Sequence, residues 1–396
     1  MGSEGGDLPQ RQMSTLAING GKPAVTGPLL PFKTIDWEEF RAIDSALASP
    51  LSGFLGGQER GGYRVNKLED RWCEIFGVKH AVACNSATSG LLMACMAAQT
   101  SGRYVVTTPF TMSATAAAPR VIGSTIKFGD IEDQTFCLAP DAQLMGAYTR
   151  AVIVTNLFGH PAELTWWRKQ CDRAGTLLIE DNAQGIFAKE GGRYAGTIGH
   201  MGVFSLNVHK HLQAGEGGVV VTDDDDLAAR LRGARNHGEM SGSPVCGLNL
   251  RMTELEATIA LVQLSKRHEI MEGRLRAALS MSDAVHVLPN LVGPKVREGC
   301  THSYYILPLR VSHHREWFVA AMNAEGVPLR AGYVDPLYRL PAFDGFACYC
   351  PVSERMHDRE LVIYENCAWS PTERQLEQFG EAFEKVVCSP RMMEAA

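Results

Sequence analysis

The sequence lacks long apolar runs, strongly basic segments and the apolar core of a signal peptide. No stretch approaches the roughly 18–20 apolar residues needed to span a bilayer, and residues 1–12 are polar and Gly-rich. Lys and Arg number 38 against 44 Asp and Glu, and the resulting net charge of −6 argues against binding to nucleic-acid phosphates as a main activity. We therefore expect a cytoplasmic protein with no membrane or nucleic-acid partner, and a disordered leader over residues 1–20.

Two nucleotide-binding signatures and a zinc signature are also missing. The chain contains neither a G-x-G-x-x-G fingerprint nor a G-x-x-x-x-G-K-[ST] loop, which disfavours an unrelated nucleotide-binding α/β protein. Its eleven cysteines are scattered, and Cys348 and Cys350 do not belong to paired C-x-x-C spacings, so no metal site is expected. We interpret the cysteines as reduced, mostly buried thiols.

What the sequence does contain is a regular alternation of short apolar strands and amphipathic helices. With 396 residues, of which 45% are hydrophobic and 21% charged, the chain has the composition of a globular protein of two or three domains. Strands are predicted over residues 80–84, 104–108, 150–157, 176–180, 202–206 and 219–222, and helices over 36–48, 63–76, 86–99, 111–122, 162–174 and 224–233. Strand–helix–strand units at this spacing predict an α/β fold of three layers, with a mostly parallel sheet between helices.

The pattern changes after a long helix that is predicted over residues 253–274. A strand, a helix, a strand and a last helix follow, over residues 304–311, 315–326, 327–333 and 372–387. This mixture is typical of an α+β arrangement. We therefore predict a large α/β domain over residues 21–275 and a smaller C-terminal α+β domain over residues 276–396.

Lys210 is the strongest candidate for a reactive group. It follows a predicted strand, lies between His209 and His211, and precedes a Gly-rich turn. Glycines allow the backbone to approach a ligand closely, and Ser205 offers a hydroxyl to an anion. A lysine that is partly buried and crowded by histidines has a lowered pKa, which favours Schiff-base formation. A solvated surface lysine is the ordinary alternative, and Lys210 alone does not exclude it.

Two further segments carry polar groups where a parallel sheet binds ligands. Asp181 falls at the carboxyl end of a predicted strand. A carboxylate there can keep the ring nitrogen of a pyridine cofactor protonated, although capping of a helix is the commoner role of such an aspartate. Residues 85–90, Asn-Ser-Ala-Thr-Ser-Gly, lie between a strand and a helix, where N–H groups and hydroxyls form a phosphate cradle. Simple capping by Ser86 or Thr88 is the alternative.

These three segments, in this order, resemble the DegT/DnrJ/EryC1/StrS family of sugar aminotransferases, which have the fold type I architecture of pyridoxal-phosphate (PLP) enzymes. Other matching segments are residues 157–162 (Leu-Phe-Gly-His-Pro-Ala), 236–238 (Asn-His-Gly) and 247–254 (Gly-Leu-Asn-Leu-Arg-Met-Thr-Glu). The similarity extends from about residue 31 to residue 387, and six ordered matches are specific where each alone is weak. The resemblance implies an aminotransferase that moves an amino group from glutamate or glutamine to a keto sugar.

The resemblance also implies roles for individual residues. Lys210 would form the Schiff base with PLP, and Asp181 would pair with the ring nitrogen. The phosphate contacts would come from Ala87, Thr88 and Ser205. Asn249 would reach the phosphate of the neighbouring subunit's cofactor, because the family builds its site across a homodimer interface.

The two faces of the cofactor ring are expected to differ. Gln184 would lie against one face. On the other face the family usually has an aromatic residue at the position of Met112, and a methionine can pack there through its polarisable sulfur. His209, Tyr333 and Tyr338 are expected to contact the substrate, and many nucleotide-sugar relatives have histidine where Tyr338 stands.

The acceptor and the type of reaction have alternatives. A nucleotide-linked keto-deoxysugar is the first choice, but residues 302–305 and 351–355 look like those of relatives that act on inosose-type cyclitols or aminoshikimate-pathway carbocycles. A PLP-dependent sugar dehydratase and a non-catalytic PLP-binding regulator are alternatives of another class. The presence of both Lys210 and Asp181 argues against the regulator.

Overall fold

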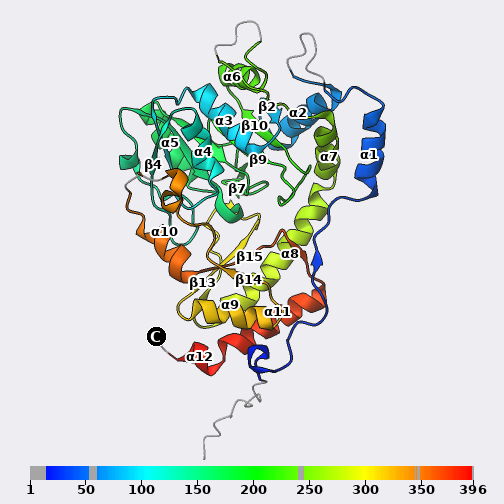
Figure 1. The fold of residues 1–396 in the computed structure, drawn as a ribbon, viewed down its shortest axis with the longest axis vertical. Coiled ribbons are helices and arrows are strands. Elements are labelled where there is room, and N and C mark those ends of the chain that lie inside the picture. Colours follow the sequence, from blue (N-terminus) through cyan, green and yellow to red (C-terminus); the bar gives the residue numbers. More distant parts are fainter. Residues whose placement is uncertain (1–14, 53–59, 240–244, 344, 346–347, 395–396) are drawn as a thin grey trace, which may run out of the picture.

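The computed structural model describes residues 15–52, 60–239, 245–343, 345 and 348–394. Figure 1 shows two parts, a large sheet with its helices and a small sheet with its own, and α8 (Arg267–His286) reaches from one towards the other. Within the described residues no helix is long and apolar enough to cross a membrane.

The large sheet has seven strands in the order β2-β10-β9-β6-β5-β3-β4. Their bounds are β2 His80–Cys84, β3 Tyr104–Thr107, β4 Thr125–Phe128, β5 Thr149–Thr155, β6 Leu177–Asp181, β9 Met201–Ser205 and β10 Gly218–Thr222. Strand β10 is antiparallel to both of its neighbours, and the remaining pairs are parallel. The prediction of a mostly parallel sheet is thus confirmed. The six predicted strands appear within two residues of their expected ends, whereas β4 was not predicted.

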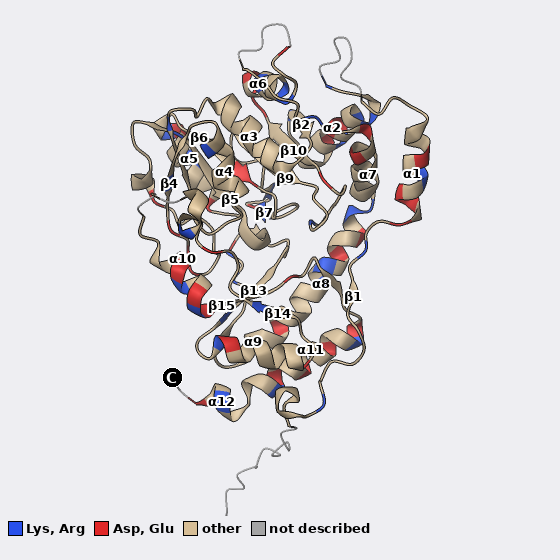
Figure 2. Cartoon of the chain, viewed as in Figure 1, with Lys and Arg blue, Asp and Glu red and all other residues tan. Residues whose placement is uncertain are grey.

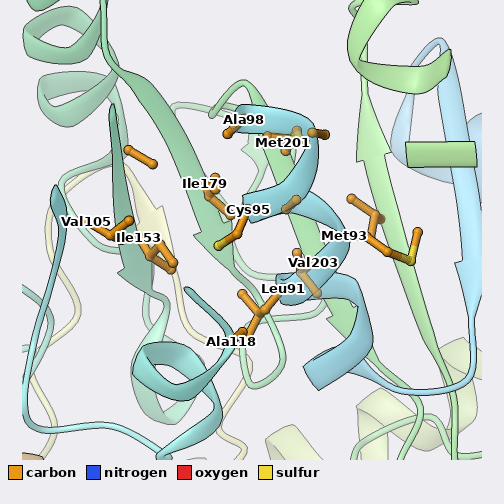
Figure 3. Packing of buried hydrophobic residues seen from close by; sticks show 14 of the residues in the cluster. Leu91, Met93, Cys95, Ala98, Val105, Ala118, Ile153, Ile179, Met201 and Val203 are labelled. Carbon is orange, nitrogen blue, oxygen red and sulfur yellow. The ribbon is translucent and has the colours of Figure 1, made fainter. Parts of the chain in front are cut away.

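Alternate residues of these strands point to opposite faces of the sheet. Helices cover both faces, so both sets of residues are buried. On one face, Leu91 and Cys95 of α3 (Ala87–Ala98) pack against sheet residues such as Ile153 and Val203 (Figure 3). The neighbouring Val154 packs on the other face with Trp167. A strand that is buried on both faces reads as a continuous apolar run, which explains the composition of these segments.

Helices on the first face are α3, α4 (Ala114–Val121) and α6 (Asp225–Arg235). The other face is covered by α2 (Tyr63–Phe76), α5 (Leu164–Ala174) and α7 (Glu254–Ser265). The outer helix α1 (Trp37–Leu47) packs on α7. The three-layer α/β/α architecture is therefore confirmed.

The small sheet is antiparallel, in the order β11-β13-β15-β14. Its strands are β11 Leu291–Val292, β13 Leu307–Val311, β14 Leu329–Ala331 and β15 Leu361–Tyr364, and α8, α9 (Arg315–Ala324) and α11 (Glu373–Val387) pack with it in one apolar cluster. The central strand β15 was not predicted. Its four residues give too short an apolar run to separate a strand from a buried helical turn.

The helix predicted over residues 253–274 is wrong as one continuous element. The structure contains α7, then Lys266 outside either helix, then α8, which continues to His286. At the interruption, the Lys266 amine donates to the Thr34 carbonyl at 2.7 Å and to Glu39 at 2.8 Å. The predicted domain boundary at residue 275 falls inside α8 and stays a prediction.

The start of the chain and the cysteines also differ from expectation. Residues 17–19, placed in the disordered leader, form a 3₁₀ turn in which the Ala17 N–H donates to Glu325 at 2.7 Å. Leu16 is buried in the small-sheet cluster, so the prediction of disorder is wrong for these residues.

All eleven cysteines are free thiols, as expected. Only five of them are buried, so the prediction that most are buried is wrong.

Remaining short elements are β1 Leu30–Pro31 paired with β16 Trp369–Ser370, and a three-stranded sheet of β7 Lys189–Glu190, β8 Arg193–Tyr194 and β12 Cys300–Thr301. The helix α10 (Pro351–Arg355) is followed by a π-helical turn at Met356–Glu360, and α12 (Pro390–Met393) ends the described chain.

A fully buried ion pair ties α2 to α6. Arg235 donates to Glu69 Oε1 at 2.6 Å, and both side chains have no exposed surface. We expect Arg235→Ala to lower the free energy of unfolding by about 3–5 kcal/mol, because it leaves the Glu69 charge buried without its main partner. Arg71→Ala, which breaks the exposed pair with Glu74, is the matched control and should cost about 1 kcal/mol or less. Urea denaturation of the cofactor-free protein measures both, and equal losses would contradict the prediction.

Candidate active site

A cavity of about 450 Å³ lies at the carboxyl ends of β6 and β9, beside the N-terminus of α3. Ligands of parallel sheets bind at this edge. Most of the predicted cofactor residues line this one cavity, namely Ala87, Thr88, Met112, Asp181, Gln184, Ser205 and Lys210. The sequence scatters them over more than 120 positions, and the fold brings them together.

Lys210 lies in the connection between β9 and β10, where its N–H donates to the Asn207 carbonyl at 2.9 Å. Its Nζ lies 4.4 Å from the centroid of the Tyr305 ring. Among the described residues, no carboxylate comes within ion-pair distance of this amine. Burial lowers the pKa of Lys210, and the Asp181 charge opposes that shift only in part. The amine therefore loses its proton more readily than an ordinary lysine does.

The neighbouring histidines contribute to this environment differently from expectation. His211 has no exposed surface, and its Nε2 bonds to the Ser303 carbonyl at 2.9 Å. Burial lowers the pKa of His211 to about 3, so this ring is neutral. His209 is exposed and lines the cavity. Burial, rather than crowding by charged histidines, is thus the main cause of the lowered pKa of Lys210.

Asp181 is the last residue of β6 and is 4% exposed. The Thr115 hydroxyl donates to Oδ2 at 2.7 Å and the Ala183 N–H donates to Oδ1 at 3.2 Å. Burial raises the pKa of Asp181, while these two donors and Lys210 lower it. The carboxyl group still has acceptor capacity towards the cavity, because each carboxylate oxygen offers two lone pairs.

The opposite end of the cavity is suited to an anion. Ser86 caps α3 by accepting from the Ser89 N–H, so the first N–H groups of the helix, those of Ala87 and Thr88, have no partner within the helix. A Cβ on Gly218 would lie 2.7 Å from the Ala87 nitrogen, which explains the glycine at this contact. A helix N-terminus with adjacent hydroxyls is a usual phosphate site.

Gln184 is held from two sides. Its Oε1 accepts from the Phe158 N–H at 2.8 Å, and its Nε2 donates to the Tyr333 hydroxyl at 2.9 Å. Burial raises the pKa of Tyr333 to about 12, so its hydroxyl stays protonated. The second bond connects the segment after β6 of the large sheet to the segment after β14 of the small sheet. Together the two bonds fix the amide in the cavity that Lys210 also lines.

A second cavity of about 250 Å³ adjoins the first and shares His209 and Tyr305 with it. Arg330 and Glu365 line it and form an ion pair of 3.2 Å with both side chains about half exposed. The sequence reasoning missed Tyr305, Arg330 and Glu365 as site residues. Residues 302–305 look like those of relatives, but nothing in the local sequence places Tyr305 beside Lys210.

Three predicted site residues either lie outside the lining of the main cavity or are largely exposed. Tyr338 is not among the residues that line either described cavity, and its hydroxyl donates to Glu354 at 2.8 Å. Asn249 is exposed and bridges to Asn236 away from these linings, and its role towards a second subunit stays a prediction. Met112 lines the main cavity but is 56% exposed.

An unpaired amine, a buried carboxylate and a helix N-terminus around one cavity match three of the polar groups of PLP, namely its aldehyde, ring nitrogen and phosphate. In the cartoon of Figure 2, the positions of Lys and Arg and those of Asp and Glu are both distributed over many elements of the two parts. The residues present therefore fit this cofactor.

Comparisons with known proteins agree with this geometry. A model of the DegT/DnrJ/EryC1/StrS aminotransferase family matches residues 50–374. The chain is 32% identical over 319 residues to the UDP-N-acetyl-3-dehydro-alpha-D-glucosamine 3-aminotransferase of Acidithiobacillus ferrooxidans, covering 79% of this chain and 84% of the relative. It is 31% identical over 317 residues to the pleiotropic regulatory protein of Geobacillus stearothermophilus, covering 77% and 82%.

Among solved structures, DesI in the presence of its TDP-sugar product superposes with a TM-score of 0.82 at 29% identity, over 95% of this chain and 97% of that one. The shared architecture is that of fold type I PLP enzymes. The chain therefore is a PLP-dependent aminotransferase and belongs to the DegT/DnrJ/EryC1/StrS family.

Proposed function

We propose that this protein transfers an amino group from glutamate or glutamine to a nucleotide-linked keto sugar. The observation that carries the chemistry is the unpaired Lys210 amine in one cavity with the buried Asp181 carboxyl. The relative named as an aminotransferase of a UDP-linked dehydro sugar supports this class of acceptor. The DesI structure, which holds a TDP-sugar product, supports it as well.

PLP, when bound, supplies an aldehyde that condenses with amines and a ring that withdraws electrons. Asp181 would accept a hydrogen bond from the protonated ring nitrogen, and the N-terminus of α3 together with Ser205 would hold the phosphate. The free amine of Lys210 would take the proton from the α-carbon of the donor. A lowered pKa brings this amine closer to the working pH, where a general base is most effective.

The second cavity supports a place for the amino donor. Arg330 is the cation in its lining that can bind a carboxylate in bidentate fashion, and Tyr305 and Tyr333 line the same cavity. Glu365 competes for the same guanidinium at 3.2 Å. Binding of the donor would therefore exchange one carboxylate for another at Arg330.

A homodimer also belongs to this proposal. Trp37 and Phe40 on α1 stack at 4.5 Å and are each 58% exposed, and Leu47 on the same helix is 60% exposed. Such an apolar stripe on an ordered helix is a surface that a partner covers. A second copy would bury it and bring an exposed residue such as Asn249 to the partner's site.

The direct test is the absorbance spectrum of the purified protein with PLP. A visible band that bleaches with glutamate or glutamine, and returns with a keto sugar as the amino sugar appears, supports the proposal. Restoration by a keto cyclitol alone would reassign the acceptor. Loss of water without amine formation would identify a dehydratase, and a band that no donor changes would favour a regulator.

Lys210→Ala should abolish the visible band and lower kcat by at least about 10³-fold, because both covalent and proton-transfer roles are lost. Lys189→Ala is a matched control, since Lys189 also lies over a tyrosine ring, at 4.5 Å from the Tyr194 centroid. Full turnover by Lys210→Ala in single-turnover and steady-state assays would contradict the assignment.

Arg330→Met should raise the donor KM by about 10- to 100-fold, the loss expected for a charge-assisted hydrogen bond, with little change in the acceptor KM. Glu365→Gln should act in the opposite direction, because it releases Arg330 from its ion pair. Arg374→Met, on the exposed face of α11, controls for removal of an arginine. Equal changes in donor and acceptor KM would argue against a donor subsite at Arg330.

A further inference from the structure

Three buried threonines form a chain of hydroxyls that ends on Asp181. Thr155 and Thr111 lie 3.1 Å apart through their Oγ1 atoms, Thr111 and Thr115 lie 3.3 Å apart, and Thr115 donates to Asp181 Oδ2 at 2.7 Å. None of the three is more than 1% exposed. The chain therefore reaches the carboxyl group through buried hydroxyls.

Secondary structure accounts for this alignment. Thr155 and Asp181 are register partners on the parallel strands β5 and β6, so their side chains share a face at the carboxyl end of the sheet. Thr115 lies in the first turn of α4, and Thr111 lies in the turn that leads into this helix. Three elements thus converge on one carboxylate, and Thr111 also borders the cofactor cavity.

The direction of the hydrogen bonds follows from the number of protons. An ionised carboxylate only accepts, so the single hydroxyl proton of Thr115 points to Asp181. Thr111 must then donate to Thr115, and Thr155 must donate to Thr111. Each donor polarises the next one in such a chain, and this strengthens the terminal bond.

We propose that Thr115, supported by Thr111 and Thr155, is a positioning residue that keeps Asp181 ionised and aimed at the ring nitrogen of PLP. The proposal rests on the assignment of Asp181 in the proposed function. The Ala183 N–H also donates to this carboxyl, and Lys210 and Tyr333 are the titratable groups that interact with it electrostatically. Lys210 changes between Schiff base and free amine during the reaction, whereas the hydroxyl chain and the Ala183 N–H keep their contacts with the buried negative charge.

The test compares Thr115→Val, which keeps the shape but removes the hydroxyl, with Thr115→Ser, which restores it. In the holoenzyme, Thr115→Val should lower kcat by about 10- to 100-fold, as expected for a hydrogen bond to a charged group, with the donor KM changed less. Thr115→Ser should remain within about threefold of the wild type. Thr155→Val, two hydroxyls further from the carboxyl, should give a smaller loss in the same direction.

Two readouts do not depend on turnover. The pH midpoint of the visible band should rise in Thr115→Val, because a ring nitrogen without its proton withdraws less charge from the lysine Schiff base. The dissociation constant of PLP, titrated against the cofactor-free protein, should rise as well. Asp181→Asn should produce both changes to a larger extent. Thermal unfolding of the cofactor-free variants reports purely structural damage.

The outcomes separate the inference from the proposed function. A changed pH midpoint in Thr115→Val with recovery in Thr115→Ser supports the positioning role. A lower unfolding temperature with wild-type pH midpoint and kcat overturns it and leaves Asp181 in place. If Thr115→Val does not fold, an unchanged midpoint in Thr155→Val overturns the chain. If Asp181→Asn also has a wild-type midpoint, the assignment of Asp181 itself fails.

Discussion

The site depends on keeping an amine and a carboxylate in one buried cavity without letting them neutralise each other. A direct ion pair would occupy both groups, and two unpaired buried charges would be costly to the fold. In the structure, the two groups are stabilised by different contacts. Asp181 is stabilised by the Thr115 hydroxyl and the Ala183 N–H, whereas Lys210 gives up its proton more readily and rests on the Tyr305 ring. Both groups are thereby left available to a ligand.

This separation of charges requires both parts of the molecule. The strand ends of the large sheet place Asp181, Ser205 and the Lys210 connection at one edge. On the side of the small sheet, Tyr305 lines the cavity, and Tyr333 of the adjoining cavity bonds to Gln184. Because Gln184 is fixed by Phe158 as well, a shift of the small sheet would move the amide that the cofactor ring is expected to contact. The geometry of the ring site is therefore coupled to how the two sheets pack.

The site residues that follow the strands of the large sheet could be identified from the sequence, whereas those contributed by distant parts of the chain could not. Asp181 ends an apolar strand and Lys210 lies in the connection that follows another, and such positions mark the ligand edge of a parallel sheet. Tyr305 and Arg330 lie roughly 100 residues beyond Lys210 in the chain, so no local pattern brings them together with it. At the break between α7 and α8, the Lys266 amine bonds to Thr34 and Glu39 of the distant N-terminal segment, contacts that no local pattern reveals. The local sequence likewise did not reveal that the Tyr338 hydroxyl bonds to Glu354, and the substrate contact expected of Tyr338 stays a prediction.

The contrast between the two expected ring faces bears on how an acceptor is chosen. Gln184 is immobilised by two hydrogen bonds, whereas Met112 is 56% exposed and has a flexible, polarisable side chain. A flexible thioether adapts to the shape of a ligand and discriminates poorly between shapes, so it adds contact without strict selection. Under the proposed function, selection would fall to the rigid polar groups that cannot adjust without loss of a hydrogen bond, which are Gln184 and Tyr333. An acceptor that displaced either group would break the hydrogen bond that joins the segment after β6 to the segment after β14.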